Sequence, residues 1–234
     1  MRPDFLAALA AVVALLGFTS PVAAQDGVPP LKRIIDISLR VPAAVDECSV
    51  ASTVVILARR FGIVAGVEYP RSQCEKIGAT RTSHGESINL QGMTVEQAFA
   101  TLASMDPRYR MVEHDGVVVL RPVDAWSDPK NILNFSSPRF ALENVTLGLA
   151  LDALLSAMVG DSPSTTDRFG TATEQGARRF SVKTGATAAG GALDAIVRAH
   201  GAAIWVVREG EIGRAFFLHT FDGGGIGASR RGLQ

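Results

Sequence analysis

The two cysteines of the chain, Cys48 and Cys74, are its best candidates for covalent chemistry. They flank a predicted helix and the strand that follows it. In an oxidising compartment the pair is expected to form a disulfide, which would stabilise the fold by about 3 kcal/mol in the chain-entropy model. Two buried thiols or a catalytic thiolate are the alternatives. A thiolate nucleophile needs a histidine beside it, and no spacing in the sequence indicates which histidine that would be.

The histidines do not form a clear metal or acid–base cluster. His84 lies close to Glu86 in a polar segment, but two ligands alone do not make a metal site. His114 follows Glu113 at a predicted hairpin turn, where solvated polar residues are expected, and His200 is expected to complement the dipole at a helix end. The chain has no HExxH, GxSxG, GxxxxGKS/T or CxxC motif. The sequence therefore predicts no catalytic residue, no metal site and no cofactor.

Two carboxylates and two indoles complete the candidates. Asp152 and Asp194 occupy matching positions on two predicted helices, and we expect both on solvated helix faces. Trp126 lies in a predicted linker. Trp205 lies on a predicted strand, where a place in the core is expected rather than a role in ligand binding.

A strand–helix unit recurs along the chain. Residues 88–95 align with 140–147, and a third copy begins at residue 180. Each copy opens with alternating apolar and polar residues, as in a half-buried strand, and continues with apolar residues at helical spacing. Threonine stands at the expected N-cap in the first two copies, and Thr94 with Gln97 fits a capping box.

The segments after the helices predict hairpins. Asp115 and Gly116 stand between two apolar runs, which is typical of a two-residue hairpin turn. Residues 117–120 and 214–219 are the second strands of the two hairpins, and we expect them to be sheet edges open to a partner strand. Two polar segments, 70–86 and 160–178, occupy matching places in the two halves and are candidate binding surfaces.

The predicted fold class is α+β: two tandem small βαββαββ domains, each with two helices packed on short β-sheets. Length and the proline-rich stretch at 122–130 set the boundaries. In chain order these are a signal peptide (1–24), a linker (25–33), domain 1 (34–122), a linker (123–130), domain 2 (131–220) and a flexible tail (221–234).

The first 24 residues are typical of a signal peptide. Arg2 supplies the positive charge, residues 5–18 are apolar, and small residues at 22–24 suit a signal peptidase. The apolar run is shorter than a transmembrane helix needs, so we expect cleavage and a mature chain with no membrane span. The predicted location is the periplasm or the exterior.

Residues 88–122 resemble the short N-terminal (STN) domain of secretins and TonB-dependent transducers. The resemblance is carried by a strand, a glycine turn, a threonine N-cap, an amphipathic helix and a hairpin, at positions Leu90, Gly92, Thr94, Val95, Ala98, Phe99, Leu102, Tyr109 and 117–120. The second half is similar at Leu142, Asn144, Thr146, Leu147, Ala150 and Leu151. This resemblance implies a non-catalytic module that contacts another envelope protein. The chain has no secretin pore domain or outer-membrane barrel segment, so channel formation is not implied.

Charge narrows the possible partners. The 23 Lys and Arg residues balance 23 Asp and Glu residues, and a neutral chain lacks the cationic excess that nucleic-acid binding requires. The sequence thus favours an exported, tandem protein-binding module of the bacterial cell envelope whose partner is an envelope protein of unknown identity. A small secreted hydrolase using His84, Glu86 and Asp167 is one alternative. The other is a structural protein that assembles with itself as a homo-oligomer.

Overall fold

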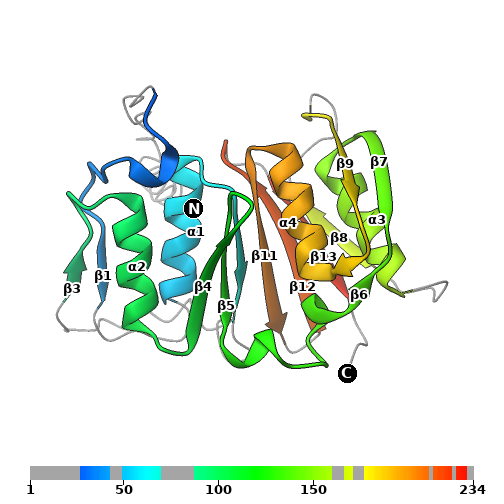
Figure 1. Ribbon diagram of the computed structural model, residues 1–234, viewed down its shortest axis with the longest axis horizontal. Coiled ribbons are helices and arrows are strands. Elements are labelled where there is room, and N and C mark those ends of the chain that lie inside the picture. Colours follow the sequence, from blue (N-terminus) through cyan, green and yellow to red (C-terminus); the bar gives the residue numbers. More distant parts are fainter. Residues whose placement is uncertain are drawn as a thin grey trace, which may run out of the picture.

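A seven-stranded mixed sheet runs through the molecule and takes strands from both halves of the sequence (Figure 1). The computed structural model describes residues 27–42, 49–69, 87–159, 166–170, 177–210, 213–222 and 225–230. The strands lie in the order β4 (Tyr109–His114), β5 (Val117–Pro122), β2 (Ala65–Glu68), β11 (Ala203–Gly210), β12 (Gly213–Thr220), β13 (Gly225–Arg230) and β8 (Thr166–Gly170). The pairs β2–β5 and β2–β11 are parallel, and the others are antiparallel. The predicted α+β class is confirmed.

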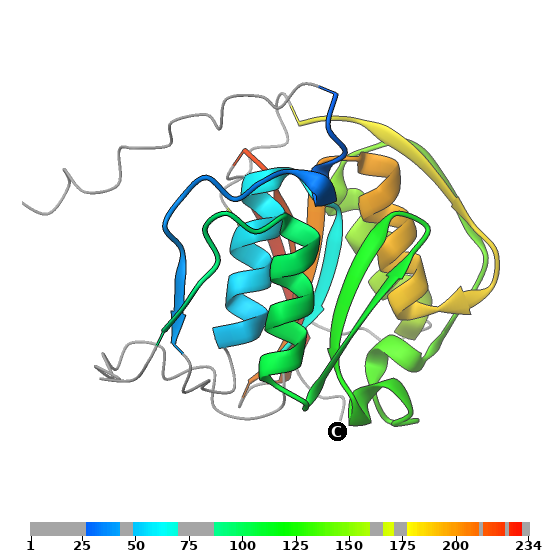
Figure 2. The same ribbon diagram turned by 60° about the vertical axis from the view of Figure 1, so that its left-hand side comes forward.

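The two halves place their helices on opposite faces of this sheet (Figure 2). Helices α1 (Ser49–Phe61) and α2 (Val95–Met105) pack on one face, and α3 (Leu147–Val159) and α4 (Ala189–His200) pack on the other. Alternate residues of β5 point to the two sides: Val118 and Leu120 belong to the core with α1 and α2, and Val117 and Val119 to the core with α3 and α4. Each central strand is therefore buried on both faces, which is why β5 is a nearly continuous apolar run.

The repeat predicted from the sequence is present in the structure. In the first half β1 (Arg40–Pro42) pairs antiparallel with β3 (Ser87–Asn89), and in the second half β7 (Phe140–Val145) pairs antiparallel with β9 (Phe180–Thr184). The remaining described elements are short: β6 (Ser136–Ser137), β10 (Thr187–Ala188), and the 3₁₀ turns η2 (Pro30–Lys32), η4 (Asp124–Trp126) and η5 (Ile132–Asn134).

Local signals in the sequence are confirmed in detail. The backbone N–H of Gln97 donates to Oγ1 of Thr94 at 3.1 Å, and the N–H of Thr94 donates to Oε1 of Gln97 at 2.9 Å, which is the predicted capping box. The turn between β4 and β5 has φ of 51° at Asp115 and 76° at Gly116, as the predicted two-residue hairpin requires.

The structure differs from the sequence predictions at the edges of the hairpins and in the C-terminal tail. Residues 117–120 and 214–219 were expected as free edges, but β5 lies between β4 and β2, and β12 lies between β11 and β13. The tail at 221–234 was expected to be flexible, yet residues 225–230 form β13, inserted between β12 and β8. Strands supplied from distant parts of the chain cover the edges that each hairpin alone would expose. Among the described strands, β4 and β8 form the borders of the sheet.

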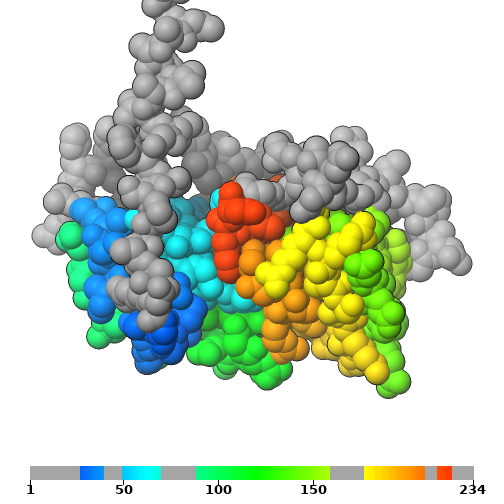
Figure 3. All heavy atoms as spheres, turned by 90° about the horizontal axis from the view of Figure 1, so that it is seen from above, coloured from blue at the N-terminus to red at the C-terminus, as the bar shows by residue number. Residues whose placement is uncertain are grey.

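The predicted boundary at 123–130 does not interrupt the sheet. β2 of the first half pairs with β11 of the second half over four residue positions. Seen from above, the atoms at the end of β12 (red) lie between first-half atoms (cyan) and α4 (orange) (Figure 3). There the N–H of Phe221 donates to the carbonyl of Ala202, and the ring of Phe221 packs against the first-half core. The two predicted domains thus share hydrogen bonds and core contacts.

Candidate functional site

A cavity of about 330 Å³ lies on the α4 side of the sheet. Its walls come from the β4–β5 hairpin, the segment with η4 and η5, β11 and the first turns of α4. The apolar part of the lining includes Val112, Val119 and Leu133, and the polar part includes His114, Arg121 and Asp194. The indoles of Trp126 and Trp205, the two tryptophans of the chain, also line it.

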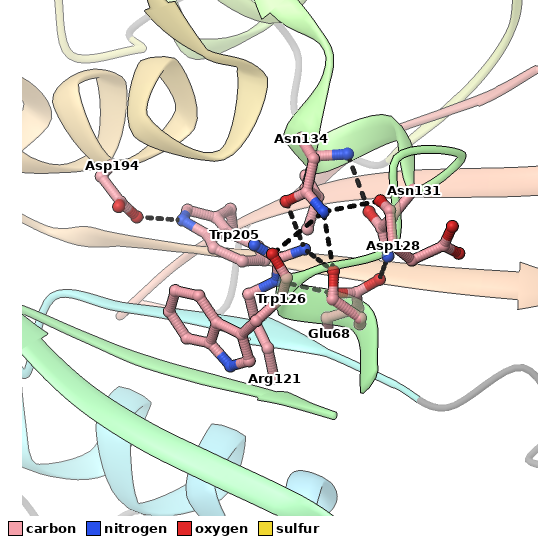
Figure 4. A network of polar contacts seen from close by, with 10 residues as sticks. Glu68, Arg121, Trp126, Asp128, Asn131, Asn134, Asp194 and Trp205 are labelled. Carbon is pink, nitrogen blue, oxygen red and sulfur yellow. Dashed lines mark hydrogen bonds and ion pairs between the residues drawn. The ribbon is translucent and has the colours of Figure 1, made fainter. Parts of the chain in front are cut away.

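Trp205 reaches this cavity because Gly66 leaves room for it. The two residues are paired in the parallel ladder between β2 and β11. A Cβ atom on Gly66 would lie only 2.0 Å from Cε2 of Trp205, so the indole lies directly over the glycine. Its Nε1 then donates a 2.7 Å hydrogen bond to Oδ1 of Asp194 on α4 (Figure 4).

The prediction that Asp194 lies on a solvated helix face is wrong. Burial raises the pKa of its carboxyl group to about 6, although the Trp205 hydrogen bond and the charges of His114, Arg198 and Arg121 act in the opposite direction. The side chain is half-buried because it faces the cavity and contacts the indole of Trp205, which lies 11 positions away on another element. No local pattern on the helix predicts this contact.

A buried polar network lies next to the cavity and contributes Arg121 and Asn134 to its lining (Figure 4). Nε of Arg121 lies 2.7 Å from Oε2 of Glu68, and Nδ2 of Asn131 donates to Oε1 of Glu68 at 2.5 Å. Arg121 also donates at 3.1 Å to the carbonyl of Ala125 and to Oδ1 of Asn134. Glu68 and Arg121 are only 7% and 5% exposed, so the charges are compensated within the protein.

This network fixes the segment that was predicted to be a linker. Nδ2 of Asn134 donates at 2.8 Å to the carbonyls of both Ala125 and Asp128, which holds residues 124–134 against β5. The guanidinium of Arg121 lies 4.8 Å from the ring centroid of Trp126, and that of Arg110 lies 5.8 Å from it. The Trp126 ring is therefore held in the cavity wall by two cation–π contacts.

The turn of the β4–β5 hairpin is fastened to α4. Asp115 Oδ2 accepts a 2.8 Å hydrogen bond from Nη1 of Arg198 and lies 3.6 Å from Nδ1 of His114. The Arg198 hydrogen bond is the largest cause of the lowered pKa of Asp115. His114 is exposed at the turn, as expected, and its side chain also reaches the cavity lining.

The other candidate residues do not join this site. Cys48, Cys74, His84 and Glu86 lie outside the described residues, and Asp167 is on β8 at the opposite border of the sheet. His200 is the last residue of α4, but it is buried. Its ring contacts that of Phe180 edge to face, with 5.4 Å between the ring centroids, and burial lowers its pKa. Within the described ranges, no three His, Cys, Asp or Glu side chains converge as metal ligands.

Comparison of the chain with protein-family models, curated proteins and solved structures gives no match. In the part of the chain that the structure describes, no helix has both the length and the apolarity needed to cross a bilayer.

Proposed function

We propose that the chain is a non-catalytic protein-binding module of the bacterial cell envelope, exported by its first 24 residues, which captures an extended segment of a partner protein by strand addition at β4. The proposal of an envelope role rests on the signal-peptide pattern and on the resemblance of residues 88–122 to the STN domain. The observation that carries the binding mode is the border position of β4, which among the described strands pairs only with β5.

The register of the hairpin identifies the backbone groups available to a partner. The N–H of Val123 donates to the carbonyl of Arg108, so the residues of β4 in phase with Arg108 direct their backbone groups toward β5. The N–H and C=O groups of Met111 and Glu113 therefore point outward. No described strand pairs with these groups, and outward groups of this kind are the template for β-augmentation.

The side chains beside this edge also favour binding. Met111 packs against the core of the first half, while Val112 and His114 line the cavity on the other face. A strand added at β4 would thus meet an apolar surface next to its backbone hydrogen bonds, and the two together would give affinity and selectivity.

The hydrolase and self-assembly alternatives each require a different feature of the structure. A hydrolase would need converging groups, and the only cavity residue with a strongly raised pKa among those described is Asp194, with no described hydrogen bond to a histidine or nucleophile. A self-assembling protein would use β4 to pair with a second copy. Both alternatives are separated from partner capture by the experiment below.

The test replaces Glu113 by proline in the full-length chain. Proline removes an outward N–H but no hydrogen bond of the β4–β5 ladder, so the fold is expected to remain while strand addition is blocked. Glu113→Ala, which keeps the N–H, is the matched control. A photo-crosslinker at Arg110 should capture an envelope protein with wild type and Glu113→Ala, and not with Glu113→Pro.

Equal capture by the proline and alanine variants would refute strand addition. A wild-type protein that sediments as an oligomer, and that Glu113→Pro dissociates, would support self-assembly instead. Turnover of a generic ester or peptide by the purified chain would show that the module interpretation is wrong.

A further inference from the structure

We propose that the cavity beside α4 binds a primary alkylammonium group, with Asp194 as its counter-ion and the indoles of Trp126 and Trp205 against its carbon chain. This site is separate from the outward backbone groups of Met111 and Glu113, and the proposal does not depend on strand addition at β4.

Asp194 has one carboxylate oxygen that accepts no hydrogen bond from the described residues. Its Oδ1 accepts the hydrogen bond from Trp205, and no donor among the described residues reaches its Oδ2. A carboxylate in an apolar cavity is costly unless a cation or further donors compensate it. An ammonium group has three donors and one positive charge, and so supplies what this carboxylate lacks.

The charged side chains that face Asp194 lie beside other carboxylates. Three cationic or titratable groups face it from three elements: His114 from β4, Arg121 from β5 and Arg198 from α4. Arg121 is bonded to Glu68, Arg198 is bonded to Asp115, and His114 lies beside Asp115. Asp194 is the one carboxyl group among the described residues that line the cavity, and it has no cation of its own within salt-bridge distance.

The walls of the cavity suit an alkyl chain that ends in an ammonium group. Val112, Val119 and Leu133 present apolar surface, and the two indoles present aromatic surface. A volume of about 330 Å³ lies at the lower end of the range for small-ligand cavities, so it suits an amine on a short alkyl chain rather than a large cofactor. Indole rings also attract an ammonium group directly.

The experiment uses the intrinsic fluorescence of the full-length chain. Both tryptophans line the cavity, so a change in emission reports on this place. Titration with n-hexylammonium chloride at pH 7.5 should give a saturable change. The uncharged analogue n-hexanol, which has the same carbon chain, should bind at least tenfold more weakly.

Variants identify the counter-ion. Asp194→Asn removes the charge but keeps an oxygen that can accept from Trp205, and it should weaken hexylammonium binding at least tenfold. Asp124→Asn removes an exposed charge from η4, outside the cavity lining, and should bind like wild type. Equal affinity for hexanol, unchanged affinity in Asp194→Asn, or the lack of any saturable change in wild type would each overturn the proposal.

The pH dependence gives an independent readout. Since the ammonium binds the ionised carboxylate, its affinity should fall as the pH decreases through the pKa of Asp194, approaching tenfold per pH unit. His114 is the one histidine among the described residues that line the cavity, and His114→Gln removes it. This variant should keep most of the fall in affinity, and loss of the fall in it would show that Asp194 is not its source.

Discussion

The indole of Trp205 on β11 fills the space above Gly66 on β2, at the parallel pairing that joins the first half of the chain to the second. A side chain at position 66 and an indole at position 205 cannot both occupy this space. The contact therefore fixes the register of β2 against β11 and aims Nε1 of Trp205 at Asp194. The absence of a side chain at Gly66 thus allows Trp205 to reach the cavity from the central sheet.

Gly66→Ala is expected to destabilise the protein by about 3 kcal/mol, because the new methyl group overpacks the site and displaces the indole. The free energy of unfolding in urea measures this. Gly185→Ala is the matched control, since a Cβ at that exposed position meets no atom within 4 Å. A smaller side chain at position 205, in Gly66→Ala/Trp205→Val, should relieve the clash, so strictly additive effects of the two substitutions would contradict this account.

The buried pair of Glu68 and Arg121 gives a second prediction. Glu68→Gln leaves the guanidinium uncompensated beneath the cavity and should cost about 3–5 kcal/mol. Removing both charges in Glu68→Gln/Arg121→Met should cost less than the single change, because no buried charge then remains. The exposed ion pair between Lys32 and Glu96 is the control: Glu96→Gln should change stability by less than about 1 kcal/mol. If the double variant is no more stable than Glu68→Gln, the loss of stability comes from the broken hydrogen bonds of Glu68 and Arg121 rather than from an unpaired buried charge.

Asp194 gives a prediction about pH. Its pKa rises from 3.8 in the unfolded chain to about 6 in the fold, so between these values the folded state binds more protons and stability falls as the pH rises. Asp194→Asn lacks this loss. It should be more stable than wild type by up to ~3 kcal/mol at pH 7.5, and the difference should shrink to less than about 1 kcal/mol at pH 4.

Thermal unfolding of both proteins between pH 4 and 8 measures this difference. Burial lowers the pKa values of His200 and His219, and such groups remove stability as the pH falls below about 6.5, the ordinary histidine value. Both proteins contain these histidines, so their effect cancels in the comparison. A variant less stable than wild type at pH 7.5 would mean that the fold stabilises the ionised carboxylate.

The features that the sequence predicts well are local. The capping box at Thr94 and the turn at Asp115 depend on residues within a few positions of each other, so their patterns determine their geometry. The repeated strand–helix unit is also visible, because period-two and helical spacings recur. These signals describe each half without reference to the other.

The cavity depends on residues that are far apart in the chain. Asp194, Trp205, Gly66 and Trp126 come together only because β2 pairs with β11 and because Arg121 and Asn134 hold the intervening segment. No turn fixes the register of a parallel pair, and the sequence of a short apolar strand does not show which strands it pairs with. Asp194 consequently looked like any solvated aspartate on a helix, and Trp205 like an ordinary core residue.

The shared sheet leads to a final prediction about the halves of the chain. Residues 31–122 alone would lose the β11 partner of β2 and would expose Val117 and Val119, which pack in the core of the second half. Residues 130–234 alone would lose the Glu68 and Arg121 groups that bond Asn131 and Asn134. We therefore expect neither fragment to unfold cooperatively as a monomer, whereas coexpression of the two should restore a soluble complex.

Circular dichroism melts and sedimentation of each fragment measure this, with the full-length chain as the reference. The two-domain interpretation from the sequence makes the opposite prediction, since two independent domains would each give a cooperative transition. If both fragments fold alone, the β2–β11 pairing is a docking contact between domains. If they fold only together, the strand–helix repeat has been joined into a single cooperative unit, because the core of each half includes residues of the other.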